Sequence, residues 1–332
     1  MATVIRAPPF APLVRAAAFL TAMHGSVHPV FRFAPSPNGR LHLGHAYSAL
    51  LNEQMARRAG GRLLLRIEDI DPARCSQEFE QAILADLDWL GVSFDEPPQR
   101  QRNRNAAYAD ALGRLASRDL VFPCLCSRAE IAARAGGLRD PDGAPPHLGR
   151  CARRADGGRE PAMRLDMAHA LALVLHPLCW REYGEANDAV SQRANPAVWG
   201  DVIIKRADAP ASYHLAVVVD DAAQGVSDVV RGRDLLHATS VHRLLQQLLA
   251  VAPPRYRHHR LVCDGAGVKM SKSATSITLA QLRARDVSPG QIRVMLGFGG
   301  TAGAQSDQLT LAVTAAPAAG ADGTALGAWA IS

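Results

Sequence analysis

Apolar and polar residues near the start of the chain predict a strand, a turn and a helix. Residues 30–34 alternate apolar and polar side chains and run into a turn rich in proline, asparagine and glycine at 35–39. From Gly44 through Ala59 apolar residues recur with helical spacing, and a Gly-Gly pair follows as a helix stop. Arg62–Ile67 is then typical of a buried strand. Strand, helix and strand in this order predict a βαβ unit and a parallel sheet.

The same patterns continue along the chain and extend this α/β prediction. Helices are expected at 76–90, 103–118 and 237–251. Strands are expected at 163–167, 202–205 and 213–219, and the polar stretch 186–197 is typical of a loop. After Ser273 the pattern fades, so we expect only a short helical C-terminal part. In such a fold binding groups lie at the carboxyl ends of the strands, where Ser36 and Glu68 both fall.

Composition narrows the class of protein but not its chemistry. Of the 332 residues, 48% are hydrophobic and 20% are charged, which is typical of a globular chain with a sizeable core. The net charge of +6 suits a polyanionic partner without identifying one. Because the sequence has no run of about 20 apolar residues, we expect no membrane association.

Residues 1–29 resemble a secretory signal faintly, but no basic segment leads into an adequate apolar run. We expect a disordered extension there, with Met23 as an alternative start.

Two histidines at the first strand-to-helix junction form the first candidate site. His42-Leu43-Gly44-His45 places two imidazoles and free backbone N–H groups at a helix N-terminus, where both can face phosphates. Gly44 lets a flat base approach the backbone, because it has no Cβ. The alternative is an ordinary turn with two surface histidines, since so short a motif is a weak signal alone.

A basic motif late in the chain forms the second candidate site. The residues are Lys269-Met270-Ser271-Lys272-Ser273, after a Gly-rich turn. Two lysines in such a loop can close over a triphosphate and offset the charge of a leaving pyrophosphate. The alternative is a solvated basic loop. Finding both motifs in this order favours the phosphate-binding interpretation.

These two motifs resemble the signatures of class I aminoacyl-tRNA synthetases. Four further segments resemble the glutamyl branch of that family, and they are 31–37, 66–74, 213–221 and 230–235. The resemblance spans residues 30–273 and implies a Rossmann-like catalytic domain that joins the α-carboxylate of glutamate to the α-phosphate of ATP. Such a reaction needs positioning and charge stabilisation more than a side-chain nucleophile.

The resemblance also implies three overlapping sets of site residues. The catalytic set, acting as electrostatic stabilisers, is His42, His45 and Lys272. The glutamate-binding set is Arg32, Phe33, Ala34, Pro35, Ser36, Glu68, Tyr213 and Arg231. The set for ATP, which binds with Mg²⁺, is His42, Gly44, His45, Lys269, Met270, Ser271, Lys272 and Ser273. The charges suit glutamate, whose two carboxylates need guanidinium groups and whose ammonium needs a carboxylate. Taken without the motifs, Arg32 is equally well a strand-edge charge and Glu68 an ion-pair partner.

Three cysteines and a histidine form the third candidate site. Cys124, Cys126, His147 and Cys151 offer thiolate and imidazole ligands, which suit a closed tetrahedral Zn²⁺ site. The alternative is incidental cysteines, because Cys75, Cys179 and Cys263 show that the chain uses unpaired thiols. The resemblance supports zinc, since relatives of the glutamyl branch carry a zinc site at this location. In those relatives a tyrosine commonly stands where this chain has His147.

Chain length separates two subfamilies of the glutamyl branch. Only 59 residues follow Ser273, too few for an anticodon-binding domain (332 − 273). The chain therefore resembles the truncated paralogues that activate glutamate without tRNA and attach it to the queuosine base of tRNA(Asp). The resemblance implies ATP, L-glutamate and tRNA(Asp) bearing queuosine as partners, and we expect a cytoplasmic monomer. The alternatives are an enzyme that charges a tRNA 3′ end and a non-catalytic module that binds glutamate or ATP.

These expectations divide the chain into five parts. They are an extension at 1–29, the first half of the catalytic domain at 30–118, a zinc-binding insert at 119–160, the second half with the lysine loop at 161–300, and a low-complexity tail at 301–332.

Overall fold

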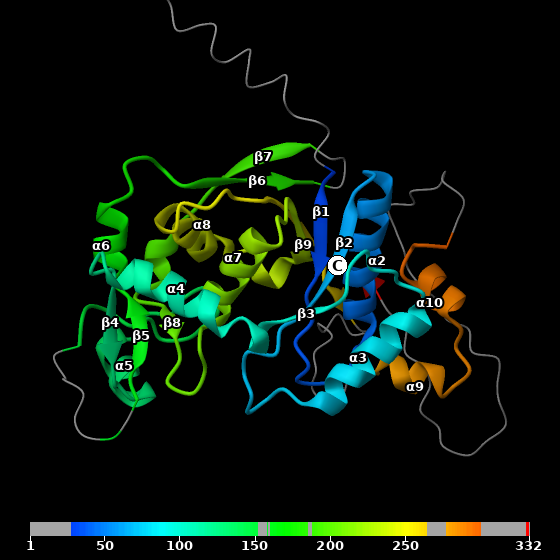
Figure 1. The fold of residues 1–332 in the computed structure, drawn as a ribbon, viewed down its shortest axis with the longest axis horizontal. Coiled ribbons are helices and arrows are strands. Elements are labelled where there is room, and N and C mark those ends of the chain that lie inside the picture. Colours follow the sequence, from blue (N-terminus) through cyan, green and yellow to red (C-terminus); the bar gives the residue numbers. More distant parts are fainter. Residues whose placement is uncertain are drawn as a thin grey trace, which may run out of the picture.

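The main sheet of the computed structural model joins seven strands in one layer (Figure 1). The structure describes residues 28–151, 158, 160–184, 188–263 and 277–299, and the backbone of 330–331. The strands, in sheet order, are β3 (Gln99–Arg100), β2 (Arg62–Ile67), β1 (Val30–Phe33), β9 (Asp228–Gly232), β10 (Arg255–His259), β6 (Cys179–Tyr183) and β7 (Ala189–Arg193). Neighbours run parallel except β6 and β7, which form an antiparallel hairpin. The predicted α/β fold with a parallel sheet is confirmed.

The predicted βαβ unit is present at the centre of this sheet. β1 pairs with β2 in parallel, with Val30 opposite Arg62. Helix α2 (Leu43–Arg58) connects them and begins after His42, whose side chain accepts from the backbone N–H of Gly44. The helix stops where predicted, because Gly60 takes a positive φ of 59° and Gly61 N–H donates to Ala56 O at 2.8 Å.

The other predicted helices form with slightly shorter bounds. They are α3 (Gln77–Leu90), α4 (Asn105–Ala116) and α8 (Thr239–Leu248). Ser76 caps α3 by accepting from Phe79 N–H, and Gly91 ends it with a φ of 73°. The expected short helical part near the C-terminus is present as α9 (Leu279–Arg283) and α10 (Pro289–Met295), which lie beside α3 in Figure 1.

A second, antiparallel sheet belongs to the region around the cysteines. Its strands are β4 (Val121–Cys124), β5 (Ala162–Leu165) and β8 (Ile203–Lys205). Helices α5 (Arg128–Ala135) and α6 (Met167–Ala172) lie with this sheet at one end of the molecule (Figure 1). The remaining short elements are η1 (Gln101–Asn103), η2 (Pro196–Trp199), η3 (Arg233–Leu235), β11 (Val262–Cys263) and β12 (Ala330–Ile331).

Two expectations about secondary structure are wrong. The apolar run 213–219 lies in helix α7 (Tyr213–Ala223), not in a strand. Ser212 caps this helix, and burial against the neighbouring helices outweighs the strand preference of three consecutive valines. The segment 186–197 is not a loop throughout, because residues 189–193 form β7. β7 is an exposed edge strand, so its polar sequence carried no hydrophobic alternation to reveal it.

Two large apolar clusters form most of the core. One gathers residues of α2 and α3 with β1 and β2, and the other gathers residues of α4, α7 and α8 with the second sheet. Among the described residues, none of the helices has the length and apolar character to cross a membrane. The extension 1–29, apart from its last two residues, and the low-complexity tail, apart from the backbone of β12, lie outside the described residues.

Candidate active site and metal centre

A cavity of about 490 Å³ opens at the carboxyl ends of the central strands. Strands β1 and β9 supply part of its wall, and the start of α2 and of α7 supplies more. Every residue of the expected glutamate set lines it, together with His42, Gly44 and His45. The carboxyl edge of a parallel sheet is where such folds bind ligands, and it gathers these residues from distant parts of the sequence.

The two histidines of the first motif lie against each other at the N-terminus of α2. Their ring centroids are 3.9 Å apart, and the backbone N–H of His42 donates to Nδ1 of His45 at 3.2 Å. A Cβ on Gly44 would lie 3.0 Å from the His42 ring, so a larger residue would push that ring. Both rings and the helix N-terminus line the cavity, although the backbone N–H groups of His42 and Gly44 donate to the two rings.

The lysine motif, residues 269–273, lies outside the described residues. The chain on both sides of the gap 264–276 reaches the cavity. Val262 lines it, and Thr278 pairs with His42 in an isolated β-bridge. Leu279 N–H donates to Leu41 O at 2.9 Å, so the chain returns beside the first motif.

A buried ionic network forms the floor below Arg32. Asp221 accepts from Arg32 Nε at 3.2 Å and from an Arg66 terminal nitrogen at 2.7 Å. Arg66 also bonds Glu68 Oε1 at 3.2 Å, and its side chain is fully buried. Burial raises the pKa of Glu68, and Arg66 and Arg32 offset part of that rise. Burial opposes ionisation of Asp221 too, but Arg32 and Arg66 outweigh it and hold its pKa below the usual range.

Arg231 lies on β9, the strand next to β1, and its hydrogen-bond partners are neutral. Its terminal nitrogens donate to Thr239 Oγ1 at 2.7 Å and, more loosely, to Tyr213 Oη at 3.4 Å. Its Nε donates to His258 Nε2 at 3.1 Å. Burial raises the pKa of Tyr213, so its hydroxyl stays protonated and can donate to a ligand.

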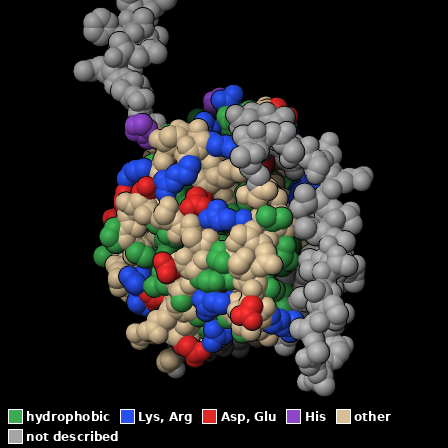
Figure 2. Space-filling view, turned by 90° about the vertical axis from the view of Figure 1, so that its right-hand side faces the viewer, with side chains coloured by type: hydrophobic (Ala, Val, Ile, Leu, Met, Phe, Trp, Pro, Cys, Tyr) green, Lys and Arg blue, Asp and Glu red, His purple; other side chains and the backbone are tan. Residues whose placement is uncertain are grey.

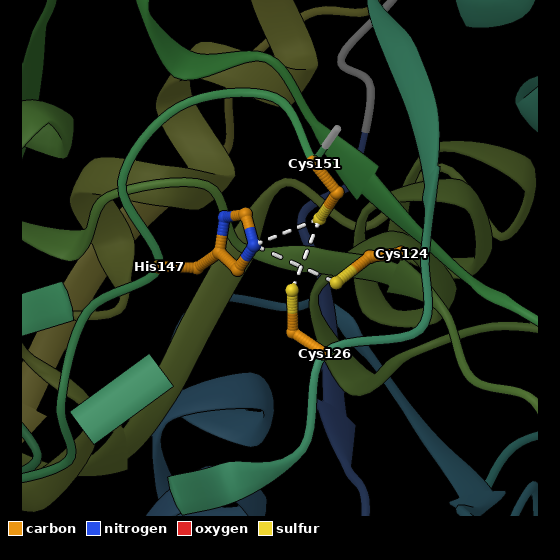
Figure 3. Close-up of side chains that lie close together, drawn as sticks. All are labelled: Cys124, Cys126, His147 and Cys151. Carbon is orange, nitrogen blue, oxygen red and sulfur yellow. Dashed lines mark hydrogen bonds between the residues drawn. The ribbon is translucent and has the colours of Figure 1, made fainter. Parts of the chain in front are cut away.

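Cys124, Cys126, His147 and Cys151 converge on one point, as Figure 3 shows. Their candidate ligand atoms all lie within 4.8 Å of one another. His147 Nε2 is 3.2 Å from Cys151 Sγ and 3.5 Å from Cys124 Sγ. A tetrahedral Zn²⁺ separates its ligand atoms by about 3.3–3.8 Å, so the cluster has the size and chemistry to hold such an ion. The structure confirms that the expected ligand residues meet in a cluster that can bind a metal.

Two further features prepare this cluster for a metal. Burial tends to raise the pKa of the Cys124 thiol, but hydrogen bonds from Cys126 N–H, Cys151 and Arg164 bring it down to about 7, while burial and the hydrogen bonds of the other two thiols raise the pKa of Cys151. A thiolate, the ligating form, is therefore accessible near neutral pH. Asp201 Oδ2 lies 3.0 Å from His147 Nδ1, which leaves Nε2 free to face the thiols.

A second cavity, of about 470 Å³, adjoins the first. Ser36, Glu68 and Tyr213 line both. Its outer wall comes from the metal-cluster region, including His147 and Asp201. The cysteine-histidine cluster thus lies beside a cavity that shares three lining residues with the candidate active site.

Several residues of these sites escaped the sequence prediction. Arg66 and Asp221 lie within the motif segments 66–74 and 213–221, but the sequence prediction did not assign either of them to a site. In the structure they form an ion pair with each other. His258 and Asp201 had no local signal, because their partners are far away in sequence. Long-range contacts of this kind appear only in the folded structure.

The outer surface beside α10, turned toward the viewer in Figure 2, mixes both signs of charge. Lysine and arginine side chains alternate there with aspartate and glutamate. This face therefore shows no extended patch of a single charge.

Comparison with known proteins identifies the family of the chain. The family model of class I tRNA synthetases (E and Q), catalytic domain, matches residues 29–314. A Glutamyl-Q tRNA(Asp) synthetase of Rhodobacter capsulatus is 43% identical over 285 residues, covering 81% of this chain and 100% of the relative. A Glutamate--tRNA ligase 2 of Alkalilimnicola ehrlichii is 36% identical, covering 76% of this chain and 54% of the relative.

Solved structures show the same fold. The crystal structure of a glutamate tRNA ligase from Elizabethkingia meningosepticum, in complex with its amino acid, superposes with a TM-score of 0.64 at 23% identity. The superposition covers 81% of this chain but 60% of the ligase, so this chain spans under two thirds of that protein. The family model and the full-length relative together establish that the chain belongs to the class I tRNA synthetases for glutamate and glutamine, within the glutamyl-Q tRNA(Asp) synthetase family.

Proposed function

We propose that the protein activates L-glutamate with ATP in the absence of tRNA and transfers the glutamate to queuosine in the anticodon loop of tRNA(Asp). The observation that carries the proposal is the first cavity. It combines two buried arginines, Arg32 and Arg231, a carboxyl group at Glu68, and a phosphate-binding helix start at His42 and His45. The relative of Rhodobacter capsulatus, named for this activity, supports the choice of substrates.

Activation forms one bond and breaks another. An oxygen of the glutamate α-carboxylate attacks the α-phosphorus of ATP, and the bond to pyrophosphate breaks as the glutamyl-adenylate forms. Arg32 and Arg231 hold the two carboxylates, and Glu68 pairs with the ammonium group. His42 and His45 stabilise the phosphate charge with the N–H groups of the α2 N-terminus. From the sequence motif we expect Lys269 and Lys272 to bind the phosphates of ATP as well. Mg²⁺ bound to ATP would neutralise further phosphate charge.

Transfer uses the second cavity. A hydroxyl oxygen of the queuosine ring attacks the glutamyl carbonyl carbon, an ester forms, and AMP leaves. The shared wall of Ser36, Glu68 and Tyr213 supports this route, because a group entering the second cavity meets the adenylate held in the first. Residues 30–118 and 161–300 would form the two halves of the catalytic domain. The reaction would take place in the cytoplasm, where tRNA is found.

Zinc completes the region that supports the second cavity. Cys124, Cys126, His147 and Cys151 would hold one Zn²⁺ as a structural ion, with the insert 119–160 folded around it. When bound, the ion would supply cross-links between β4 and the loop that carries His147. The donor set of three thiols and one imidazole favours zinc over Mg²⁺ or Ca²⁺, which prefer oxygen ligands.

A second candidate function is the charging of a tRNA 3′ end. The Glutamate--tRNA ligase 2 of Alkalilimnicola ehrlichii favours it, because it is 36% identical to this chain. Labelled glutamate offered with tRNA(Asp) that contains or lacks queuosine separates the two functions. Labelling that requires queuosine supports the leading proposal, and equal labelling of both tRNAs contradicts it.

The first experiment is glutamate-dependent exchange of pyrophosphate with ATP, measured without tRNA. Exchange is the expected result, because adenylate formation is reversible and needs no acceptor. Its absence would favour a non-catalytic module that binds glutamate or ATP. A matched control replaces glutamate with glutamine, which lacks the second carboxylate.

A further inference from the structure

The guanidinium of Arg231 is held in an unusual way for a buried charge. It has five N–H donors, and five neutral acceptors take them. The acceptors are His258 Nε2, Tyr213 Oη, His242 Nδ1, Leu235 O and Thr239 Oγ1. Within the described part of the chain, no carboxylate forms an ion pair with it. Buried charges ordinarily pair with an opposite charge, so this arrangement needs an explanation.

Arg32, on the neighbouring strand β1, shows the ordinary arrangement. It pairs with Asp221 at 3.2 Å, and Asp221 also neutralises part of the charge of Arg66. The two cavity arginines therefore differ in their electrostatic state. Arg32 forms a direct ion pair with Asp221, whereas Arg231 interacts with that carboxylate only at longer range.

The partners of Arg231 are fixed in their neutral forms by hydrogen bonds that continue away from the cavity. His258 Nδ1 lies 2.8 Å from Glu182 Oε2, so Nδ1 carries the proton and Nε2 accepts from Arg231. His242 Nε2 lies 3.2 Å from His214 Nδ1, so Nε2 donates there and Nδ1 accepts from Arg231. Both imidazoles thereby present a lone pair to the guanidinium.

Burial and the nearby guanidinium keep these rings uncharged. Burial lowers the pKa of His258 to about 4, and the Arg231 charge adds to this effect, although Glu182 opposes it. Burial and Arg231 also hold the pKa of His242 well below its usual range. At neutral pH both rings accept hydrogen bonds without adding a charge.

We propose that His242 and His258 are positioning residues, which hold Arg231 toward the cavity through neutral acceptors and so leave its positive charge for a carboxylate of the substrate. The inference rests on the proposed activation of glutamate. A carboxylate at either position would orient the guanidinium equally well, but it would neutralise the charge that the substrate must meet. The longest contact of Arg231, at 3.4 Å to Tyr213, lies at the cavity wall and is the one a substrate carboxylate would replace.

The test compares His242→Asn, His242→Leu and His242→Asp in pyrophosphate exchange without tRNA. Asparagine can place its oxygen where Nδ1 lies, so His242→Asn should keep the glutamate KM within about threefold of the parent. His242→Leu removes one acceptor and should raise it roughly tenfold. His242→Asp keeps an acceptor but compensates the charge, so it should also raise the glutamate KM, while the ATP KM stays unchanged in all three.

Two further measurements keep the result unambiguous. Ser240→Ala alters a buried polar residue of α8 whose hydroxyl accepts from Asn195 N–H rather than from Arg231, and should leave the glutamate KM unchanged. If a His242 variant does not fold, Thr239→Val removes the hydroxyl at 2.7 Å from Arg231 and should raise the same KM. Equal glutamate KM values for His242→Asp, His242→Asn and the parent would overturn the inference. Absence of exchange in the parent would instead contradict the proposed function.

Discussion

His147 and Asp201 are bound to each other twice, through side chains and through backbone. Asp201 Oδ2 lies 3.0 Å from His147 Nδ1, and Asp201 N–H donates to His147 O at 2.8 Å. The other carboxylate oxygen accepts from Met167 N–H at 3.0 Å. The neighbouring Gly200 makes the close approach possible, because a Cβ there would lie 2.3 Å from His147 O. This pair fixes the ring that faces the three thiols.

We predict that Asp201→Asn loosens the metal site. An amide has one oxygen, so it cannot accept from both His147 Nδ1–H and Met167 N–H. Zinc affinity should fall by about 10- to 100-fold, measured by transfer to a chromogenic chelator. The absorption spectrum of the Co²⁺-substituted protein supplies a readout that does not depend on activity. Asp208→Asn is the control, since Asp208 forms an exposed pair with Arg206. Unchanged metal release would refute a role for Asp201.

Removal of two metal ligands should separate the two reaction steps. Cys124→Ser combined with Cys151→Ser should release zinc, and should weaken glutamate transfer to tRNA more than pyrophosphate exchange. The reason is that the cluster supports the second cavity rather than the first. Metal content by mass spectrometry and both activities are measured together. Cys179→Ser, at an exposed free cysteine, is the control. A loss of equal size in both activities would contradict this division.

Glu68→Ala should raise the glutamate requirement while ATP binding stays largely intact. Loss of a charged hydrogen-bonding partner for the substrate ammonium predicts an increase of about 10- to 100-fold in glutamate KM. Arg66 retains Asp221 at 2.7 Å, so the network below the cavity keeps its main ion pair. Glu78→Ala removes an exposed carboxylate as a control. An unchanged glutamate KM would exclude Glu68 from the substrate site.

The buried histidines should make the free energy of unfolding depend on pH. Burial and the charge of Arg231 lower the pKa of His214 to about 4, from a usual value near 6.5. Between pH 6.5 and 4 the unfolded chain therefore binds a proton at this histidine that the folded chain does not bind. The contribution of His214 to the free energy of unfolding is complete above pH 6.5 and is lost as the pH falls toward 4. The loss is about 2 kcal/mol at pH 5 for one such residue.

Thermal unfolding of His214→Asn between pH 8 and pH 5 measures this effect. The variant should lose less stability than the parent as the pH falls, because it lacks one of the buried imidazoles. His237→Asn removes an exposed histidine and is the control. Parallel stability curves for the parent and His214→Asn would show that His214 does not contribute.

The sequence predicted the parts of the fold and site that depend on local patterns. The β1–α2–β2 unit follows from alternation, helical spacing and a glycine stop, and all three are short-range features. The metal cluster was predicted from ligand type and spacing. Helix α7 was missed, because its valines favour a strand locally and only packing makes them helical. Asp201 and His258 could not be assigned, since their partners lie 54 and 27 residues away.

The two cavities meet at a common wall but have different linings beyond it. Ligands of one therefore need not leave before ligands of the other arrive. In kinetic terms, the nucleic acid should not compete with ATP or with glutamate for free enzyme. The glutamyl-adenylate can therefore form before the tRNA binds, and the enzyme can hold it until the tRNA arrives.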